Sequence, residues 1–278
     1  VGIHDSFFDL GGDSIKALQV SARLAAEGWK MTIRDLFQFP TIQKLTDHIT
    51  PAVSAADQGP VEGKAVLTPI QRRFFSQPDA FRYHYNQSVM LFNEIGFRDD
   101  ALRQALRRLA VHHDALRMVF TKDQAGRIIQ HNRGTDLQDE ELYHLHITDW
   151  TKEPQALIHA EEQIAKEEAR IQKAMRLEQG PLLQAGLFKT ADGDYLLIAI
   201  HHLVVDGVSW RILLEDLSAA YQHALEGREI KLPPKSDSYH SYANALVQSA
   251  ESRKLLQEKP YWESVINAQT AVLPKDQP

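Results

Sequence analysis

The sequence predicts a small all-α segment followed by a larger domain of the α/β or α+β class. The first fifty residues contain only short helical patterns, whereas from about residue 66 long amphipathic stretches alternate with apolar runs. The stretch "PAVSAADQGPVEGK" between them is rich in proline, alanine and glycine, which is typical of a linker. We therefore divide the chain into four parts: residues 1–50, a linker at 51–65, a main domain at 66–232 and, after the start of the double proline in "KLPPKS", a segment at 233–278.

The first fifty residues predict short helices around a modest core. In "FFDLGGDSIKAL", two glycines and Asp13 deliver Ser14 to the expected start of a helix. The apolar residues of that helix approximate one stripe: Ile15, Leu18, Val20, Leu24 and Ala25. "MTIRDLFQF" predicts a short helical turn that Pro40 ends. "TIQKLTDHI" predicts a helix with three apolar residues on one face: Ile42, Leu45 and Ile49.

Strand and helix patterns alternate along the main domain. We expect strands at residues 86–92, 115–120 and 127–132. We also expect three helices: one that starts at Asp99, one that follows a cap at Thr148 or Asp149, and one that starts at about Ser238. The carboxylate of Asp99 suits the positive end of a helix dipole. Residues 181–202 predict a hairpin that turns at Asp192-Gly193, a strong turn signal.

The stretch "YLLIAIHHLVVDGVSW" holds the most informative pattern. Five apolar residues, 196–200, predict a buried strand that ends in His201 and His202. Adjacent strand residues point to opposite faces, so only one of the two histidines can face a given cleft. An imidazole there can exchange protons near neutral pH if a partner orients it. The alternative is that both histidines are ordinary strand-end residues.

Asp206 and Gly207 follow at the start of the next helix. Asp206 can cap that helix or hold an arginine, for which Arg117 in "HHDALR" is the candidate; the alternative is a surface arginine. Gly207 keeps the backbone clear of a bound ligand. The positive end of the helix would disfavour an imidazolium nearby and leave the ring ready to act as a base.

Composition excludes several classes of function. The net charge is −6 and the 31 basic residues are interspersed with acids, so we expect no nucleic-acid partner. No apolar run reaches the length of a membrane span, and we expect no membrane partner. The absence of cysteine fits a reducing cytoplasm, where we place the protein. His144 and His146 share a strand face without an evident third ligand, so we expect no metal.

Ser14 has three possible roles: nucleophile, helix cap or attachment point. A hydrolytic nucleophile needs a base, and "GGDS" differs from the GxSxG turn of hydrolases. The glycines lack the GxGxxG spacing of a phosphate-binding loop. A cap or an attachment point therefore remains for this serine.

Several motifs together resemble the nonribosomal peptide synthetases. "FFDLGGDSIKALQVSARL" is similar to their peptidyl carrier motif, and "HHLVVDGVSW" resembles the HHxxxDG motif of their condensation and epimerization domains. Further matches occur in the same order: "LTPIQRRFF", "HHDALRMVF" and "LPPKSDSYHSYANAL". The resemblance implies a helical carrier, with 4'-phosphopantetheine on Ser14, followed by a chloramphenicol-acetyltransferase-like lobe. Arg73 departs from the family, which has tryptophan there.

Two features favour epimerization over condensation within this resemblance. Carriers that feed epimerization domains typically have GGDS, and Asp13 matches; Ser209 and Trp210 match the residues that follow Asp-Gly in epimerization domains. The implied reaction inverts the Cα of a carrier-bound aminoacyl or peptidyl thioester, with His202 as acid or base and with His201 and Asp206 beside it. The alternatives are a condensation domain that forms amide bonds, or a docking lobe without chemistry. A chloramphenicol-type acyltransferase conflicts with the fused carrier.

The resemblance also implies parts that this sequence lacks. Family members supply a glutamate from a later EGHGRE-like motif, and the chain contains no such motif. We expect a carrier without its first helix, the first lobe of the epimerization domain and the start of its second lobe, inactive as an isolated chain. The implied partners are four: the thioester substrate on the chain's own carrier, an upstream adenylation domain, a downstream condensation domain of a partner synthetase, and a phosphopantetheinyl transferase.

Overall fold

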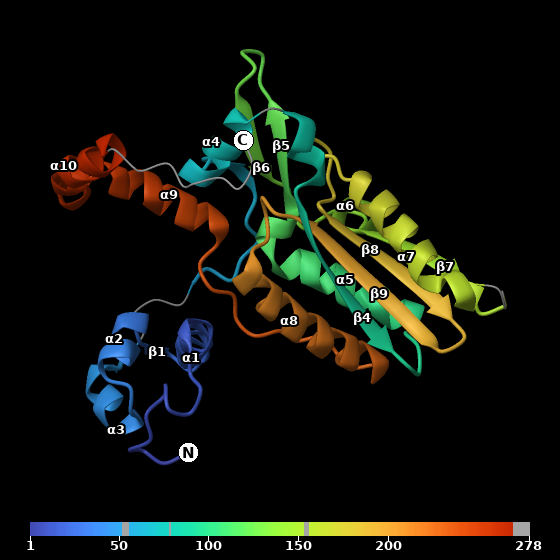
Figure 1. The fold of residues 1–278 in the computed structure, drawn as a ribbon, viewed down its shortest axis with the longest axis horizontal. Helices are drawn as coiled ribbons and strands as arrows, with labels where there is room; N and C mark the ends of the chain where they lie inside the picture. The colour runs from blue at the N-terminus through green and yellow to red at the C-terminus, as the bar shows by residue number, and fades with distance from the viewer. Residues whose placement is uncertain (52–55, 78, 153–155, 269–278) are drawn as a thin grey trace, which may run out of the picture.

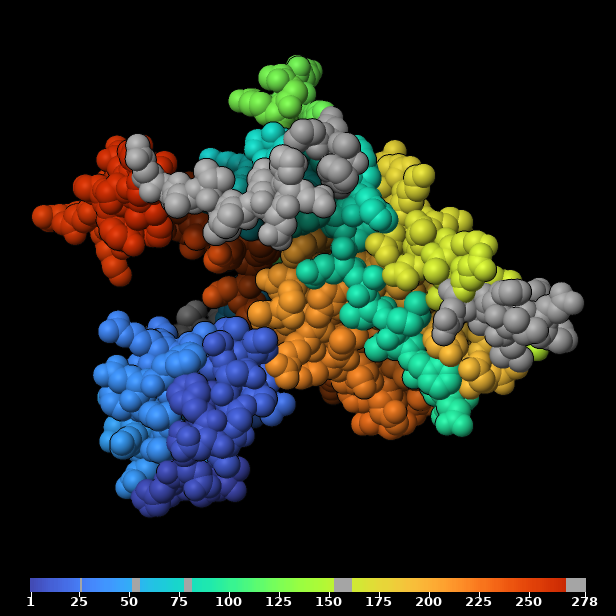
Figure 2. All heavy atoms as spheres, viewed as in Figure 1, coloured from blue at the N-terminus to red at the C-terminus, as the bar shows by residue number. Residues whose placement is uncertain are grey.

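The computed structural model describes residues 1–51, 56–77, 79–152 and 156–268. The first of these ranges contains short helices and one two-stranded ladder: α1 (Ser14–Ala26), β1 (Trp29–Lys30), α2 (Ile33–Gln38), α3 (Ile42–Leu45), the 3-10 turn η1 (Thr46–His48) and β2 (Thr50–Pro51). β1, which follows α1, pairs antiparallel with β2, which follows η1. Figure 2 shows this segment as a body of its own beside a larger lobe.

The interior of the small segment is closed by four buried side chains: Ala17, Met31, Leu36 and Leu45. Four residues that the sequence placed on inner faces are exposed instead: Ile15, Leu18, Ala25 and Ile42. Helical residues three and four positions apart share a face, and the inner face of α1 follows Ala17, Val20 and Leu24. The predicted stripe was therefore wrong for Ile15, Leu18 and Ala25, which do not belong to that face.

The larger lobe is built on a four-stranded sheet with the order β4-β9-β8-β7. Its strands are β4 (Asn86–Asn93), β7 (His144–Asp149), β8 (Leu183–Thr190) and β9 (Gly193–His201). β9 lies antiparallel to both β4 and β8, and β7 is parallel to β8. Thr190 is paired with Gly193, which confirms the hairpin turn predicted at residues 192–193.

A second, three-stranded sheet contains β3 (Gly63–Ala65), β6 (Ile128–Asn132) and β5 (Met118–Lys122) in that order. β3 lies within the range predicted as linker, so the linker prediction was wrong for residues 63–65. The strand predicted at 115–120 was also partly wrong, because residues Asp114–Arg117 form a 3-10 turn, η3, before β5. From this turn the buried Arg117 side chain donates to the carbonyls of Ala110 and Val111. An extended strand would not bring the side chain to these carbonyls.

Helices cover both faces of the four-stranded sheet (Figure 1). α5 (Asp99–His112) and α8 (Gly207–Leu225) pack together on one face. α7 (Ala156–Lys173) covers the other, where Ile171 meets Phe188 and Leu197. Side chains of β9 therefore alternate between two cores, as a strand buried on both faces requires. Thr148 and Asp149 end β7, so their predicted role as the helix cap was wrong; residues 153–155, before α7, lie outside the described residues.

Shorter elements complete the lobe: α4 (Pro69–Ser76), the 3-10 segment η2 (Asp79–His84), α6 (Asp139–Leu142), α9 (Tyr239–Ala250) and α10 (Arg253–Asn267). Ser238 caps α9, as predicted. Arg73, on α4, is exposed and takes no part in the core. α10 is exposed along its whole length and stands away from the sheets (Figure 1). Within the described residues, no helix has the length and apolar character needed to cross a membrane.

Candidate functional site

His201 is the last residue of β9 and its side chain is fully buried. Its Nε2 lies 2.6 Å from the backbone carbonyl oxygen of Arg82, and its Nδ1 accepts the backbone N–H of Leu203 at 3.1 Å. A carbonyl only accepts, so Nε2 carries the proton and the ring is neutral. Burial lowers the pKa of His201 to about 4 against the opposing effect of the Arg82 carbonyl. Both ring nitrogens are occupied within the fold, which makes His201 a structural residue.

His202 turns to the other side of the strand and is only partly buried. Its backbone N–H donates to the carbonyl of Tyr85 at 2.8 Å, and its ring stacks on the Tyr85 ring with centroids 4.9 Å apart. Its Nδ1 lies 2.7 Å from the carbonyl oxygen of Val205. The two histidines thus divide as the strand alternation predicted: His201 faces inward and His202 is accessible.

Two further side chains complete the surroundings of the His202 ring. Gln87, on β4, places its Nε2 3.3 Å from Nε2 of His202. Trp210, on α8, donates its indole N–H to Oε1 of Gln87 at 2.9 Å. Neither Gln87 nor Tyr85 was predicted from the sequence. The available signal was an inward-facing polar residue in the alternating strand "YNQSVMLF", where Gln87, Val89 and Leu91 share a face.

Asp206 is the N-cap of α8, which confirms one of its two predicted roles. Its Oδ1 accepts the backbone N–H of Ser209 at 2.8 Å and the Ser209 hydroxyl at 2.6 Å. Partial burial raises the pKa of Asp206, but the Ser209 hydrogen bonds and the charge of His202 outweigh that effect and hold it below its usual value. A Cβ built on Gly207 would meet nothing within 4 Å, so the space beside it is open.

Arg117 does not contact Asp206, and the predicted ion pair between them was wrong. The Arg117 side chain is 1% exposed and donates to four backbone carbonyls: Val61, Ala110, Val111 and Arg133. Burial lowers its pKa, with the Asp114 carboxylate acting in the opposite direction. The arginine therefore ties α5 to the segment before β3 and to the residue after β6. Asp206 uses its carboxylate on its own helix.

A histidine pair at the end of α5 makes a separate contact with α8. His113 Nε2 lies 2.8 Å from Oδ2 of the buried Asp216, and the His112 ring lies edge-on to His113. His112, His113 and Asp216 could in principle surround a metal ion. The positive charges of Arg108 and Lys235 act on the same cluster. Because the carboxylate already holds His113 and cations lie near, we assign the cluster to the packing of α5 on α8.

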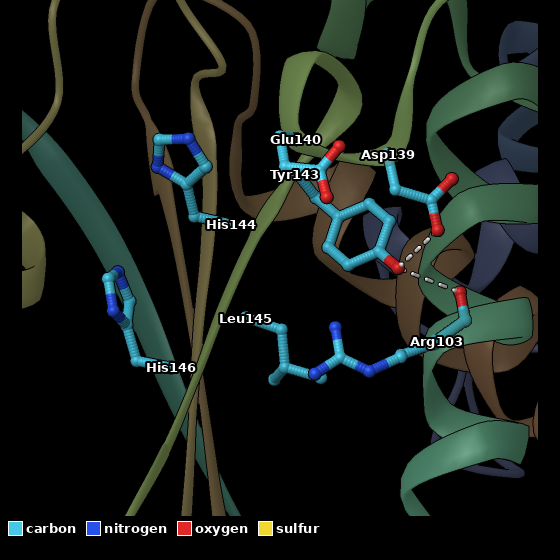
Figure 3. A pocket seen from close by; sticks show the side chains of 7 residues that line it. All are labelled: Arg103, Asp139, Glu140, Tyr143, His144, Leu145 and His146. Atoms are coloured by element: carbon cyan, nitrogen blue, oxygen red, sulfur yellow. Dashed lines mark hydrogen bonds between the residues drawn. The ribbon is translucent and has the colours of Figure 1, made fainter.

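A hollow of about 310 Å³ lies beside β7. Figure 3 shows the side chains that line it. The Tyr143 hydroxyl donates to the Asp139 carboxylate there, while the His144 and His146 rings lie on the other side of the strand. The two rings are 6.1 Å apart, and His144 Nδ1 is 3.2 Å from Oε1 of Gln184. In the described part of the chain no third ligand joins this pair into a metal-binding group.

The "GGDS" stretch forms a tight turn that exposes Ser14. Gly11 has a φ of +81°, and a Cβ on Gly12 would collide with the Phe7 carbonyl oxygen, so both positions need glycine. Asp13 caps α1 by accepting the Lys16 backbone N–H at 2.7 Å, a bond that is the main reason why its pKa is lowered. Ser14 is the first residue of the helix and is exposed.

Residues 61–278 match the family described as "Condensation domain", and residues 1–49 match "Phosphopantetheine attachment site". The chain belongs to the condensation-domain family. Its first segment is a phosphopantetheine attachment domain, whose cofactor is 4'-phosphopantetheine. The turn fits that group, because an exposed hydroxyl at a helix N-terminus lies where backbone N–H groups and the helix dipole favour a phosphate.

Curated relatives of this condensation-family chain are peptide synthetases. The chain is 67% identical over 276 residues to a plipastatin synthase of Bacillus subtilis (strain 168), covering 99% of the chain and 11% of that protein. It is 47% identical over 277 residues to tyrocidine synthase 2 of Brevibacillus parabrevis, covering 99% and 8%. The resemblance to nonribosomal peptide synthetases is confirmed, and the chain spans about a tenth of the length of these relatives.

Solved structures show the same fold. The epimerization domain from the third module of tyrocidine synthetase B matches with a TM-score of 0.74 and 45% identity, over 80% of this chain and 48% of that one. The starter condensation domain of rhizomide synthetase matches with a TM-score of 0.62 and 20% identity, over 74% and 48%. The predicted condensation or epimerization type of lobe is confirmed as a fold.

Proposed function

We propose that this chain takes part in inverting the Cα of an aminoacyl or peptidyl thioester held on its own carrier. The observation that carries the proposal is the position of the partly buried His202 ring. Its Nδ1–H donates a hydrogen bond to the Val205 carbonyl, which leaves Nε2 as the nitrogen that can take a proton. The 45% identity to an epimerization domain supports this choice over condensation domains, whose likeness is about 20%.

The proposed chemistry is a proton removal and a proton return. A thioester acidifies the neighbouring Cα–H, and Nε2 of His202 takes that proton while the electron pair moves into the thioester carbonyl as an enolate. Return of a proton to the opposite face of the planar Cα gives the inverted configuration. A second acid or base group must act on the other face of Cα, since one ring reaches one side only.

Asp206 and Gly207 support the reaction around His202. The carboxylate of Asp206 favours the positive charge that the ring acquires when it takes the proton. The open space beside Gly207 leaves room for the thioester to approach the ring, because no neighbouring side chain in the described part of the chain occupies it. Ser209 holds Asp206 in place through two hydrogen bonds.

Ser14 supplies the attachment point in this proposal. A chain without cysteine has no thiol of its own, so the thioester sulfur comes from 4'-phosphopantetheine carried on the serine. A phosphopantetheinyl transferase must reach the exposed turn to attach the group. An upstream adenylation domain would then load the arm, and a downstream condensation domain of a partner synthetase would take the product.

A condensation role is the second candidate, because the family match carries that description. In that role His202 would assist attack of an amine on the thioester carbonyl, and Cα would keep its proton. A docking lobe without chemistry would form no amide bond and would also leave Cα unchanged. Only the epimerization role exchanges the Cα proton.

Exchange at Cα therefore tests the proposal. In the intact synthetase polypeptide, with an aminoacyl group loaded on the carrier in deuterated water, we expect deuterium to enter Cα and both configurations to appear. His202→Ala should stop both, while His131→Ala, an exposed histidine on β6, should leave them unchanged. Undiminished exchange in His202→Ala, or amide formation without any exchange, would overturn the proposal.

A further inference from the structure

We propose that Gln87 and Trp210 form a positioning pair that fixes which nitrogen of His202 is free to take a proton. The inference rests on the proposed function for its consequence, but its structural part stands on two groups of fixed polarity, the Val205 carbonyl and the Trp210 indole. The Gln87 amide lies between the His202 ring and the Trp210 indole.

The Val205 carbonyl determines which nitrogen of the His202 ring carries the proton. A carbonyl oxygen only accepts, and it lies 2.7 Å from Nδ1 of His202, so Nδ1 carries the ring proton. In a neutral imidazole the other nitrogen, Nε2, then presents a lone pair. The atom of Gln87 that faces Nε2 must therefore be a donor.

Trp210 determines which atom of the Gln87 amide faces the His202 ring. An indole N–H only donates, and it lies 2.9 Å from the Gln87 side chain, so the Gln87 atom that faces it must be the amide oxygen. This leaves the amide NH₂ pointing at Nε2 of His202, at 3.3 Å. An amide rotated by half a turn would set two acceptors against each other at His202 and two donors against each other at Trp210. Both ends select the same orientation.

The selected orientation has a chemical consequence. The long 3.3 Å contact holds the Nε2 lone pair in place without a short bond that substrate would have to displace. When His202 is protonated, its Nε2–H meets the NH₂ of Gln87, and the amide cannot turn its oxygen toward the ring without losing Trp210. The pair therefore favours the neutral ring with a free Nε2, which is the form that accepts a proton.

Other charged or titratable groups around the ring act independently of this pair. Asp206, ahead of α8, attracts a positive charge on His202, whereas His201, at the end of β9, repels one. Tyr85, from the segment before β4, stacks on the ring face. None of these touches Nε2, so a change at Gln87 alters the contact at Nε2 and leaves the Val205 contact at Nδ1 in place.

Three substitutions and a matched control test the pair. Gln87→Leu removes the donor, Trp210→Phe removes the indole N–H but keeps most of the packing, and Gln87→Glu replaces the donor with an acceptor. Ser88→Ala is the control, because Ser88 follows Gln87 on β4 and contacts Glu168 on the opposite face of the strand. A purely structural role for Gln87 predicts equal loss of folding stability and activity without any change in the ring.

The first readout is the ¹⁵N spectrum of histidine-labelled protein, with the His202 signals assigned from His202→Gln. We expect an unprotonated Nε2 and a protonated Nδ1 in the parent chain and in Ser88→Ala. Gln87→Leu and Trp210→Phe should raise the share of rings with a protonated Nε2, and Gln87→Glu should raise it further, while the Val205 carbonyl still holds the proton on Nδ1. Unchanged His202 signals in all three variants would overturn the pair, whatever reaction the protein catalyses.

The second readout is Cα exchange in the intact synthetase as a function of pH. Loss of one neutral hydrogen bond should lower kcat about 3- to 10-fold in Gln87→Leu, with little change in KM. The acidic limb of the profile should move up by roughly 0.5 to 1 pH unit, further in Gln87→Glu, and not in Ser88→Ala. An altered ¹⁵N spectrum with no exchange even in the parent protein would reject the proposed function while leaving the tautomer assignment intact.

Discussion

Helices α1 and α8 each begin after an aspartate whose carboxylate accepts the backbone N–H three residues further on. The caps have nearly the same backbone angles, with φ −137° and ψ 177° at Asp13 and φ −140° and ψ 178° at Asp206. In α1 the functional residue, Ser14, lies directly after the cap and is exposed. Near α8 the proposed proton acceptor, His202, lies four positions before the cap, and other elements hold its ring.

This difference matches the two kinds of chemistry. A group that another enzyme must modify needs exposure and a favourable field, and one capped turn provides both. A proton acceptor needs a defined tautomer and orientation, which a single turn cannot provide. His202 therefore draws on β4, α8 and the loop that joins β9 to α8. Changes at the first helix should act locally, and changes at the second should act through contacts.

The largest effect is expected at the carrier serine. Ser14→Ala should abolish the mass increase that a phosphopantetheinyl transferase produces, because the attachment oxygen is gone, and with it all thioester chemistry. Intact-protein mass spectrometry before and after treatment measures this directly. Ser249→Ala, at another exposed serine, should gain the full mass. A mass increase retained by Ser14→Ala would show that the group is attached elsewhere.

The next largest effect is expected from acid, which should lower the stability of the lobe at a higher pH than that of the carrier. Burial holds the pKa of both His201 and His112 at about 4, below the usual 6.5, so the unfolded lobe binds protons more readily between these values. The lobe should be fully stable above pH 6.5 and lose stability as pH falls toward 4, on the order of 3 kcal/mol for His201. The pKa values of Asp13 and Asp35 are lowered from 3.8, so their contribution to carrier stability is lost only below that pH.

Indole NMR signals can follow both regions in one denaturant titration, with Trp29 reporting on the carrier and Trp210 on the lobe. The lobe midpoint should fall between pH 6.5 and 4 while the carrier midpoint stays constant, and His112→Gln should flatten the slope for the lobe. Parallel loss in both regions over this pH range would contradict the assignment.

Local signals were sufficient for one site and only partly for the other. The glycine, aspartate and serine of "GGDS" act through neighbours in sequence, so the position of Ser14 at the start of a helix followed from the sequence directly. Strand alternation likewise separated His201 from His202. Gln87 was missed because its role depends on the pairing of β4 with β9, and Arg117 was misassigned because its buried carbonyl partners lie in three different segments. Such contacts depend on register and packing rather than on spacing.

The glycines beside the two caps should respond differently to a methyl group. Gly12→Ala forces a Cβ against the Phe7 carbonyl and should destabilise the carrier by about 1–3 kcal/mol. Gly207→Ala meets nothing within 4 Å and should change lobe stability by less than about 0.5 kcal/mol. Denaturant unfolding of each variant measures this. Equal destabilisation would mean that both turns are packed alike, against the open space seen beside Gly207.

The smallest effects should come from replacing each cap by asparagine, which caps helices as well as aspartate does. Asp13→Asn should leave both the melting temperature of the carrier and its modification by the transferase unchanged, because only the hydrogen bond to Lys16 is needed.

Asp206→Asn should also preserve the fold, yet lower the rate of Cα exchange roughly 3- to 10-fold. The reason is that a carboxylate attracts the positive charge of an imidazolium nearby, and a neutral amide cannot favour the imidazolium formed when the ring takes a proton. A parallel run of both variants, with circular dichroism for helix content and deuterium uptake for turnover, compares the caps directly. If Asp206→Asn exchanges at the parent rate, the carboxylate is only a cap there, and the two helix starts differ solely in where their functional residue lies.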